Sequence, residues 1–544
     1  MLFMENAAPP SFFAAKWIPI IISLLVVSAV SWLYVLYYQR STGRSWLVSA
    51  MVAFSLSVTL LILVIIPVDV YAISSMKHKD GTFEPWASRN ATREHIENTI
   101  MTGYYVLYTL VFFVVFFLLP FAYFFYREPK ANEERGRPEL TARQRARTAV
   151  KYSMLFVVLF FVLVALGLLV PFAPPPPVNS TAWHKFEFLV EELETESGED
   201  VISILLYSLS LVGMCAVVGY TGLGLSLWPI RLLRGQESVQ EQREDVRQER
   251  RRLQLQINTL RDQANYSTFP SWQVDRLNSL EREEAVLGRR ETELNEAVGN
   301  WMNRCSGFFR PFEVVLGITV LVTGAVTFTA LLLSNIDKAL HSLGMKTGYI
   351  LPERQLPNPM DWLLSESDRL YPLDYILYLV LIFTLVGATV SCIQDIGVRV
   401  FAVKLYSIRP GRTPAHGLIL LVLSLVYVLL ALNVLLLSIA PQYTMYGDQH
   451  YIKDEVQPDG SVKREVLPCT ASAPAGECVL SRMALLLLRF SYKAWIFGAV
   501  FYWATWLFLL SVVMGFFIAL YRRRPRQGAG LPTEEDRLLD NVDA

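Results

Sequence analysis

Long apolar runs alternate with polar segments along most of the chain. Nine of these runs are about 20 residues long and carry few or no charges, which is the length a helix needs to cross the ~30 Å apolar core of a bilayer. The runs lie at about 17–38, 46–67, 102–126, 153–172, 203–228, 311–333, 373–393, 415–440 and 495–521. This pattern predicts an all-α polytopic membrane protein with nine transmembrane helices.

The segment 229–310, between the fifth and sixth runs, has a different pattern. Apolar residues recur every seven positions at Val239, Val246, Leu253 and Leu260. A second apolar stripe follows at three- and four-residue steps, formed by Leu277, Leu280, Leu287, Leu294, Val298 and Trp301. Pro270 separates the two stripes, because proline interrupts a helix. We therefore expect a charged coiled-coil hairpin of two antiparallel helices.

The role of this expected hairpin stays open. Glu284 and Glu291 interrupt the second apolar stripe, so the seam between the helices is imperfect. The hairpin is interpreted either as a solvated spacer or lid, or as a docking arm for a partner.

The predicted organisation is spans one to five in 1–228, the hairpin in 229–310, spans six to nine in 311–521 and a tail in 522–544. A loop at 441–494 separates spans eight and nine.

Composition supports the membrane assignment. Hydrophobic residues make up 53% of the chain, and charged residues only 18%, against about 25% in soluble proteins. These values exclude a soluble enzyme, a DNA-binding module and a secreted disulfide scaffold. The first run is long enough to span and no small-residue cleavage pattern follows it, so we expect a retained anchor rather than a cleaved signal peptide.

The distribution of basic residues orients the spans. The net charge is +0, but Lys and Arg cluster in the loop 127–151, in the turn 394–414 and at the start of the tail from Arg522 to Arg526. Cytosolic loops carry the excess of basic residues. The N-terminus is therefore expected on the lumenal side, with the hairpin and the C-terminus in the cytosol.

Three signals in the predicted lumenal loops agree with this orientation. Asn90 and Asn179 begin Asn-X-Ser/Thr sequons, which are glycosylated only on the lumenal side. Cys469 and Cys478 enclose a short stretch and fit a disulfide in an oxidising compartment. The stretch 185–200 is acidic.

Motifs for catalysis or metal binding are absent from the sequence. No segment matches a P-loop, H-E-x-x-H, G-x-S-x-G or a paired C-x-x-C motif, and the six histidines show no ligand spacing. No catalytic residue, metal site or intrinsic cofactor is therefore expected, and the protein is predicted not to be an enzyme.

Acidic residues within spans would be the usual indication of transport, and they are few. Asp69 follows Pro67 at the edge of span two, and Asp374 follows Pro372 at the start of span seven. We expect both to be interfacial, capping a helix end or pairing locally. The alternative is a buried polar site at the lumenal end of the bundle. So few charges argue against an ion-coupled pump.

The tail carries an acidic dileucine pattern. Glu534 is followed after three residues by Leu538 and Leu539. Clathrin adaptors bind the acidic residue in a basic patch and the leucines in an apolar pocket. The predicted cytosolic position would give such adaptors access, and the motif then predicts delivery to endosomes and lysosomes.

Several strings resemble one known family. They include Pro67-Val68-Asp69, Asp80–Ala87, Leu333–Ser342, Pro372–Leu377, Leu405–Thr413 and Ala440–Gly447. In this order, with nine spans, a long loop after span five and a Cys pair after span eight, the chain resembles the lysosomal cobalamin transport escort proteins of the limb-region membrane protein family.

The resemblance implies a function as well as a fold. It implies a lysosomal membrane protein that brings cobalamin, the cobalt-containing cargo, from lumen to cytosol. Such a protein acts as a chaperone that escorts and anchors an ABC half-transporter, with cytosolic cobalamin-processing proteins docking nearby. Family members are also linked to clathrin-dependent receptor endocytosis at the plasma membrane, and an escort also passes through the endoplasmic reticulum.

Two other functions stay open from the sequence. One is a membrane receptor or endocytic adaptor, of the lipocalin-receptor type or acting in clathrin-dependent internalisation. The other is a direct channel. Moving a large polar cargo uphill needs an energy source, and the sequence shows neither a nucleotide site nor an ion-coupling path. An accessory role beside an ATP-hydrolysing partner therefore fits best.

Overall fold

The computed structural model describes most of the chain. The described residues are 10–39, 46–134, 142–169, 197–235, 239–266, 271–299, 306–349, 351, 354–400, 403–406, 408, 411, 413–456, 462–470, 473–474, 477–493 and 495–521. They form two compact units, residues 1–225 with 322–515 and residues 226–321 with 516–544.

Within the described ranges, nine helices are long and apolar enough to cross a membrane, which confirms the predicted number. They are α1 (Pro10–Tyr38), α2 (Trp46–Ser74), α3 with η1 and α4 (Asn90–Phe113, Val114–Leu118, Leu119–Glu134), α5 (Ala142–Leu169), α7 with η2 and α8 (Ser197–Ala216, Val217–Gly222, Leu223–Arg234), α12 (Ser306–His341), α14 (Leu373–Ile396), α15 (Ala415–Ile439) and α18 (Trp495–Tyr521). The elements η1 and η2 are single π-helical turns within spans three and five.

Span two is longer than its sequence pattern indicates. The prediction ended it at residue 67, but α2 continues through Pro67 to Ser74. A proline is tolerated inside a transmembrane helix because neighbouring groups can satisfy the freed carbonyl. Asp69 therefore lies within the helix, about one turn before its end, and not beyond it.

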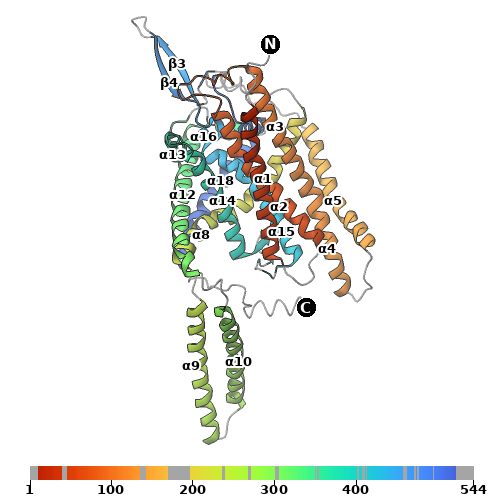
Figure 1. Cartoon of the computed structure of the whole chain (residues 1–544). Helices are drawn as coiled ribbons and strands as arrows, with labels where there is room; N and C mark the ends of the chain where they lie inside the picture. The colour runs from red at the N-terminus through yellow and green to blue at the C-terminus, as the bar shows by residue number, and fades with distance from the viewer. Residues whose placement is uncertain are drawn as a thin grey trace. The chain divides into compact units, whose positions relative to one another are not determined.

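In the larger unit, α15 is the central helix. Of its apolar window 78% is buried, against 11% for the windows of α1 and α5. The helix packs against α7 and α2. Helix α2 in turn packs against α1 and α3 (Figure 1). The exposed apolar surfaces of α1 and α5 fit helices at the edge of a membrane bundle.

Glycines in span five permit this close packing. A Cβ atom on Gly213 would overlap the main-chain oxygen of Tyr427 in α15, and one on Gly224 would overlap that of Ala388 in α14. A Cβ on Gly222 would overlap the Ser511 hydroxyl in α18. The fourth glycine of this stretch, Gly219, has nothing near its Cβ position. Three of the four glycines therefore serve helix approach.

In the smaller unit, α9 (Val239–Tyr266) and α10 (Ser271–Gly299) lie side by side (Figure 1). Their core consists of Leu253, Ile257 and Leu280, with Leu260, Leu277 and Leu287 packed against it. The two glutamates that interrupt the apolar stripe pair across the seam: the Arg250 guanidinium contacts Glu284 at 2.7 Å and Glu291 at 2.9 Å. The charged residues that interrupt the apolar stripe thus form ion pairs between the two helices.

Two small antiparallel hairpins accompany the helices. They are β1 (Val398–Val400) with β2 (Val403–Tyr406), and β3 (His450–Val456) with β4 (Val462–Pro468). The sequence analysis did not predict them, although Asp459-Gly460 between the second pair is a common hairpin signal. The remaining short elements are η3 (Met345–Thr347), α13 (Pro359–Ser367), η4 (Asp368–Leu370), α16 (Pro441–Tyr446) and α17 (Arg482–Lys493).

Candidate functional site

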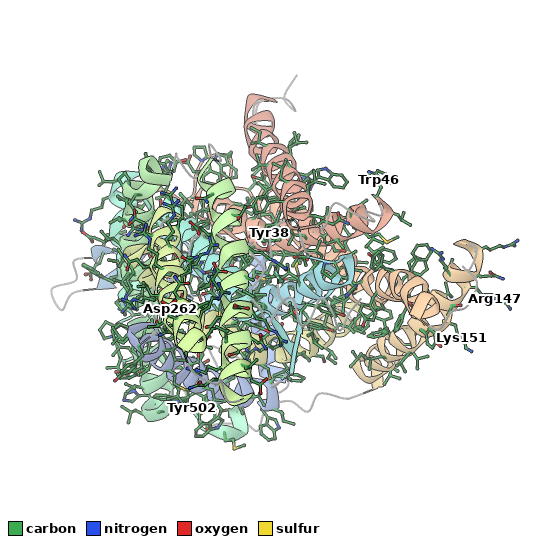
Figure 2. The ribbon with its side chains drawn as sticks, turned by 90° about the horizontal axis from the view of Figure 1, so that it is seen from below. Tyr38, Trp46, Arg147, Lys151, Asp262 and Tyr502 are labelled. Carbon is green, nitrogen blue, oxygen red and sulfur yellow. A yellow bond between two sulfur atoms is a disulfide. The ribbon has the colours of Figure 1, made fainter. Side chains whose placement is uncertain are left out.

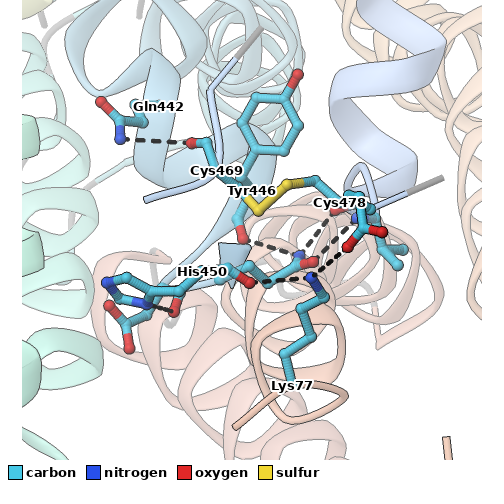
Figure 3. The surroundings of a disulfide bond; sticks show 10 residues. Lys77, Gln442, Tyr446, His450, Cys469 and Cys478 are labelled. Carbon is cyan, nitrogen blue, oxygen red and sulfur yellow. Dashed lines mark hydrogen bonds and ion pairs between the residues drawn. A yellow bond between two sulfur atoms is a disulfide. The ribbon is translucent and has the colours of Figure 1, made fainter. Parts of the chain in front are cut away.

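The polar residues that the sequence singled out gather at one end of the larger unit. We call this region the disulfide end; it comprises residues 69–97, 334–375 and 439–493 within the described ranges. Cys469 and Cys478 form a disulfide there, with their Cα atoms 6.0 Å apart (Figure 3). The disulfide lies against Tyr446 and Tyr451 in a small apolar cluster.

Lys77, which follows α2, fastens the disulfide loop to the bundle (Figure 3). Its ammonium donates to the main-chain oxygen of His450 at 2.9 Å and lies 3.8 Å from the Glu477 carboxylate. The same ammonium lies 4.7 Å from the centre of the Phe83 ring. Burial lowers the pKa of Lys77, and Glu477 opposes that shift. One buried cation therefore holds two segments that are more than 370 residues apart in sequence.

Gln449 forms the polar centre of the same loop. Its side-chain amide donates to the main-chain oxygens of Tyr446 at 2.9 Å and Val479 at 2.8 Å, and its Oε1 accepts from the Val479 N–H at 2.9 Å. The main-chain oxygen of Gln449 accepts from the Cys469 N–H at 2.8 Å. The buried side-chain amide of Gln449 thus has hydrogen-bond partners for both its nitrogen and its oxygen. These bonds fix the path of the loop on both sides of the disulfide.

Asp69 is fully buried and joins three segments. Its Oδ2 accepts from the Met483 N–H at 2.9 Å and from the Tyr104 hydroxyl at 3.2 Å. The carboxylate thereby binds a free N–H in the first turn of α17, where a negative charge is favourable. The neighbouring Arg482 forms an ion pair with Glu97 of α3. Asp69 caps a helix end, but that end belongs to α17 and not to its own helix.

Asp374 is also fully buried, in the first turn of α14. Its Oδ2 accepts from the Tyr443 hydroxyl of α16 at 2.8 Å. The neighbouring Tyr378 hydroxyl lies 3.2 Å from the Thr444 hydroxyl, and the Ser481 hydroxyl donates to the Thr444 carbonyl at 2.7 Å. These bonds join α14, α16 and the start of α17.

The sequence analysis missed two residues of this region, Asn358 and Asp361. Asn358 Oδ1 accepts from the Met360 N–H at 2.9 Å, which caps α13, and its Nδ2 donates at 2.8 Å to the main-chain oxygen of Ile439 at the end of α15. Asn358-Pro359 is a helix-start signature that could have identified this cap. No sequence signal indicates the bond to residue 439.

Asp361 caps α16. Its carboxylate accepts from the N–H groups of Tyr443 at 3.0 Å and Gln442 at 3.3 Å, both in the first turn of α16. The Arg354 guanidinium lies 3.9 Å away. Burial raises the pKa of Asp361 to about 6 despite these favourable contacts.

A second group of acidic residues lies nearby. The Lys79 ammonium contacts the Asp368 carboxylate at 2.5 Å, and this contact raises the pKa of Lys79. Burial and the neighbouring Asp368 raise the pKa of Asp448. These two acids and the lysine come from the turn after α16, from η4 and from the loop after α2.

The arrangement favours structural cross-linking over chemistry. In the part of the chain that the structure describes, no group of three or more His, Cys, Asp or Glu residues could hold a metal ion. The buried acids bind main-chain N–H groups, tyrosine hydroxyls or cations of other segments. Such contacts hold the segments of the disulfide end together.

The structure describes only some of the other residues that the sequence analysis used, either as predicted sites or to orient the spans. Asn90 is exposed at the first position of α3, where it is accessible for glycosylation. Arg147 and Lys151, from the basic segment used for orientation, are exposed on the outer side of α5 (Figure 2). Asn179, Glu534, Leu538 and Leu539 lie outside the described residues.

Known proteins resemble this chain over nearly its whole length. Residues 16–309 match the LMBR1-like membrane protein family. A probable lysosomal cobalamin transporter of Nematostella vectensis is 35% identical over 95% of this chain and 96% of its own length. The lysosomal cobalamin transport escort protein LMBD1 of Mus musculus is 34% identical over 96% of both chains. The protein of that name from Homo sapiens is 33% identical over 94% of both. No solved structure matches the chain.

Proposed function

The chain belongs to the LMBR1-like membrane protein family, and on that premise we propose that it is a lysosomal membrane escort required for the export of cobalamin from lysosome to cytosol. The observation that carries the proposal is the extent of the similarity. Relatives named as lysosomal cobalamin transport proteins align over 94–96% of this chain, with identities of 33–35%.

We further propose that the escort acts with an ABC half-transporter and does not move cobalamin by itself. Uphill movement of a large polar cargo needs an energy source, and the sequence has no P-loop. The buried acids Asp69, Asp361 and Asp374 are held by contacts between segments. A separate ATP-hydrolysing partner would supply the missing energy.

The location of the partner tests the escort role. In cells that lack this chain, the half-transporter should stay in the endoplasmic reticulum, and re-expression of the full chain should return it to lysosomes. Normal lysosomal delivery of the transporter in the deficient cells would contradict the escort role.

Orientation and sorting belong to the same proposal. The N-terminus and the disulfide end would face the lumen, and the α9–α10 hairpin and the tail would face the cytosol, where cobalamin-processing proteins and clathrin adaptors could dock. Glycosidase treatment should shift the mobility of the protein, and Asn90→Gln with Asn179→Gln should abolish that shift. Leu538→Ala with Leu539→Ala should redirect the protein to the cell surface. Unchanged lysosomal delivery would exclude the dileucine signal.

Reconstitution distinguishes this proposal from the alternatives. The purified chain alone in liposomes should show no cobalamin flux. Flux without an ABC partner would favour the direct channel. A receptor or endocytic adaptor would instead predict that loss of the chain changes receptor internalisation while lysosomal cobalamin stays normal.

A further inference from the structure

The connection between α12 and α14 exposes three large apolar side chains. Trp362 of α13 is 66% exposed, Leu370 of η4 is 70% exposed and Tyr371 is 68% exposed. We call these three residues the connector patch. Large apolar residues gathered on the surface of a protein usually mark contact with something other than water.

The opposite face of α13 fixes the direction of this patch. Met360, Asp361 and Leu364 are buried, and Asp361 binds the first turn of α16 through two N–H groups. Asn358 anchors the start of the helix. Because both polar residues face inward and are bonded, α13 cannot turn Trp362 toward the core without breaking these bonds.

The same bonds set the depth of the patch relative to the spans. Asn358 donates to Ile439, the last residue of α15. Leu370 and Tyr371 lie two to three residues before Leu373, where α14 begins. The patch therefore lies at the level where span seven begins and span eight ends. In a membrane, this level is the boundary between the apolar core of the bilayer and its headgroups.

Aromatic side chains continue from the patch onto the spans. The Tyr371 ring centre lies 6.1 Å from that of Tyr375 in α14, and Tyr375 lies 5.4 Å from Tyr71 in α2. Tyr71 is itself partly exposed on the side of its span. Tyrosine and tryptophan are enriched at this boundary of membrane proteins, because their rings are apolar and their polar groups still reach water.

From this placement we propose that Trp362, Leu370 and Tyr371 insert into the headgroup layer of the lipid leaflet at the disulfide end, so that α13 is a membrane-surface anchor and not a water-exposed loop. The adjacent Arg369–Glu366 ion pair, at 2.8 Å and largely exposed, would remain among the headgroups. This inference is independent of the escort role. It makes lipid contact, rather than a soluble lumenal partner, the occupant of the patch.

Site-specific fluorescence tests the anchor in the full chain. Cys215, Cys305 and Cys392 are replaced by alanine, and the Cys469–Cys478 disulfide is kept. Single variants Trp362→Cys and Leu370→Cys are labelled with an environment-sensitive fluorophore in phosphatidylcholine nanodiscs. Quenching is then measured with lipids that carry a nitroxide near the headgroup and with aqueous iodide. Glu465→Cys, on an exposed site of β4, is the matched control at the same end of the molecule.

If α13 is a membrane-surface anchor, the two quenchers should act in opposite order on the labels at 362 and 370 and on the label at 465. Labels at 362 and 370 should be quenched by the lipid nitroxide and several-fold less by iodide than the label at 465. The proposal is overturned if labels at 362 and 370 behave like the label at 465, because the patch would then lie in water and be available to a protein partner. Monodisperse elution and an intact disulfide establish that each variant is folded, and a variant that fails this check is replaced by Tyr371→Cys.

Discussion

At the residue scale, the disulfide end is held by a few buried polar side chains, each of which satisfies main-chain groups of another segment. Asp69 binds α17, Asn358 binds the end of α15, Asp361 binds α16, and Gln449 binds both arms of the disulfide loop. Helix ends leave N–H and C=O groups without partners, and a buried end must find them elsewhere. Loss of one such partner is costly because the group left behind is shielded from water.

The pKa of Asp361 predicts how stability depends on pH. Because burial raises this pKa from 3.8 to about 6, the folded protein keeps a proton that the unfolded chain releases. The contribution to stability is therefore full below about pH 4 and is lost as the pH rises through about 6, by on the order of 3 kcal/mol. The apparent Tm of the wild type should rise between pH 7 and pH 5, in the direction of an acidic lumen.

The variant Asp361→Asn isolates this contribution, since it cannot titrate and can still accept from the N–H groups of α16. Its apparent Tm should depend less on pH between 4 and 7 than that of the wild type. Glu366→Gln, at an exposed position of the same helix, is the matched control and should keep the wild-type slope. Equal slopes for wild type and Asp361→Asn would show that Asp361 does not titrate in this range.

At the element scale, the spans and the α9–α10 seam could be predicted from the sequence because their physics is local and periodic. Nine apolar runs, the heptad residues Leu253 and Leu260, and Leu280 of the second apolar stripe were identified in this way. Ile257 was missed because it lies four residues after Leu253, off the strict seven-residue repeat. Pro67 was read as a helix end, yet α2 continues to Ser74.

The contacts between distant loops could not be predicted from one sequence. The bond from Met483 to Asp69 joins positions that are 414 residues apart, and the bond from Lys77 to His450 joins positions 373 apart. No periodicity or capping motif encodes such a pairing. The sequence identified Asp69 and Asp374 as notable and predicted the Cys469–Cys478 disulfide, but nothing in it indicates the partners of the two aspartates.

Span five provides a prediction about helix packing. Gly213→Ala should destabilise the protein by about 1–3 kcal/mol, because the added methyl group overlaps the backbone of α15 and the helices must separate. Gly219→Ala, six residues later in the same span, adds a methyl group where nothing lies near. It should be neutral or slightly stabilising, since alanine favours helix more than glycine. Thermal unfolding in nanodiscs compares the two variants, and equal losses would contradict this packing.

The α9–α10 pair provides a second prediction, in which apolar contact outweighs charge pairing. Leu280→Ala removes a buried core residue and should lower the local stability of both helices by about 2–3 kcal/mol. Arg250→Gln removes partly exposed ion pairs and should cost about 1 kcal/mol or less. Amide hydrogen exchange over 239–299 in the full chain measures both effects. A larger effect for Arg250→Gln would mean that the charges, and not the leucines, hold the seam.

At the scale of the whole molecule, the described residues combine nine helices long and apolar enough to span a membrane with a disulfide end held by contacts between distant segments. Two edge helices, α1 and α5, present apolar surface to the membrane. Among the described residues, the buried charged side chains all lie at the disulfide end: Asp69, Lys77, Asp337, Asp361 and Asp374. Relatives that align over almost their whole length are named for lysosomal cobalamin transport.

The most direct test of this role is the distribution of radiolabelled cobalamin in cells that lack the chain. Labelled cobalamin taken up by endocytosis should remain in isolated lysosomes, cytosolic label should fall, and re-expression of the full chain should restore the normal distribution. An unchanged ratio of lysosomal to cytosolic label, with or without the chain, would contradict a role in lysosomal cobalamin export.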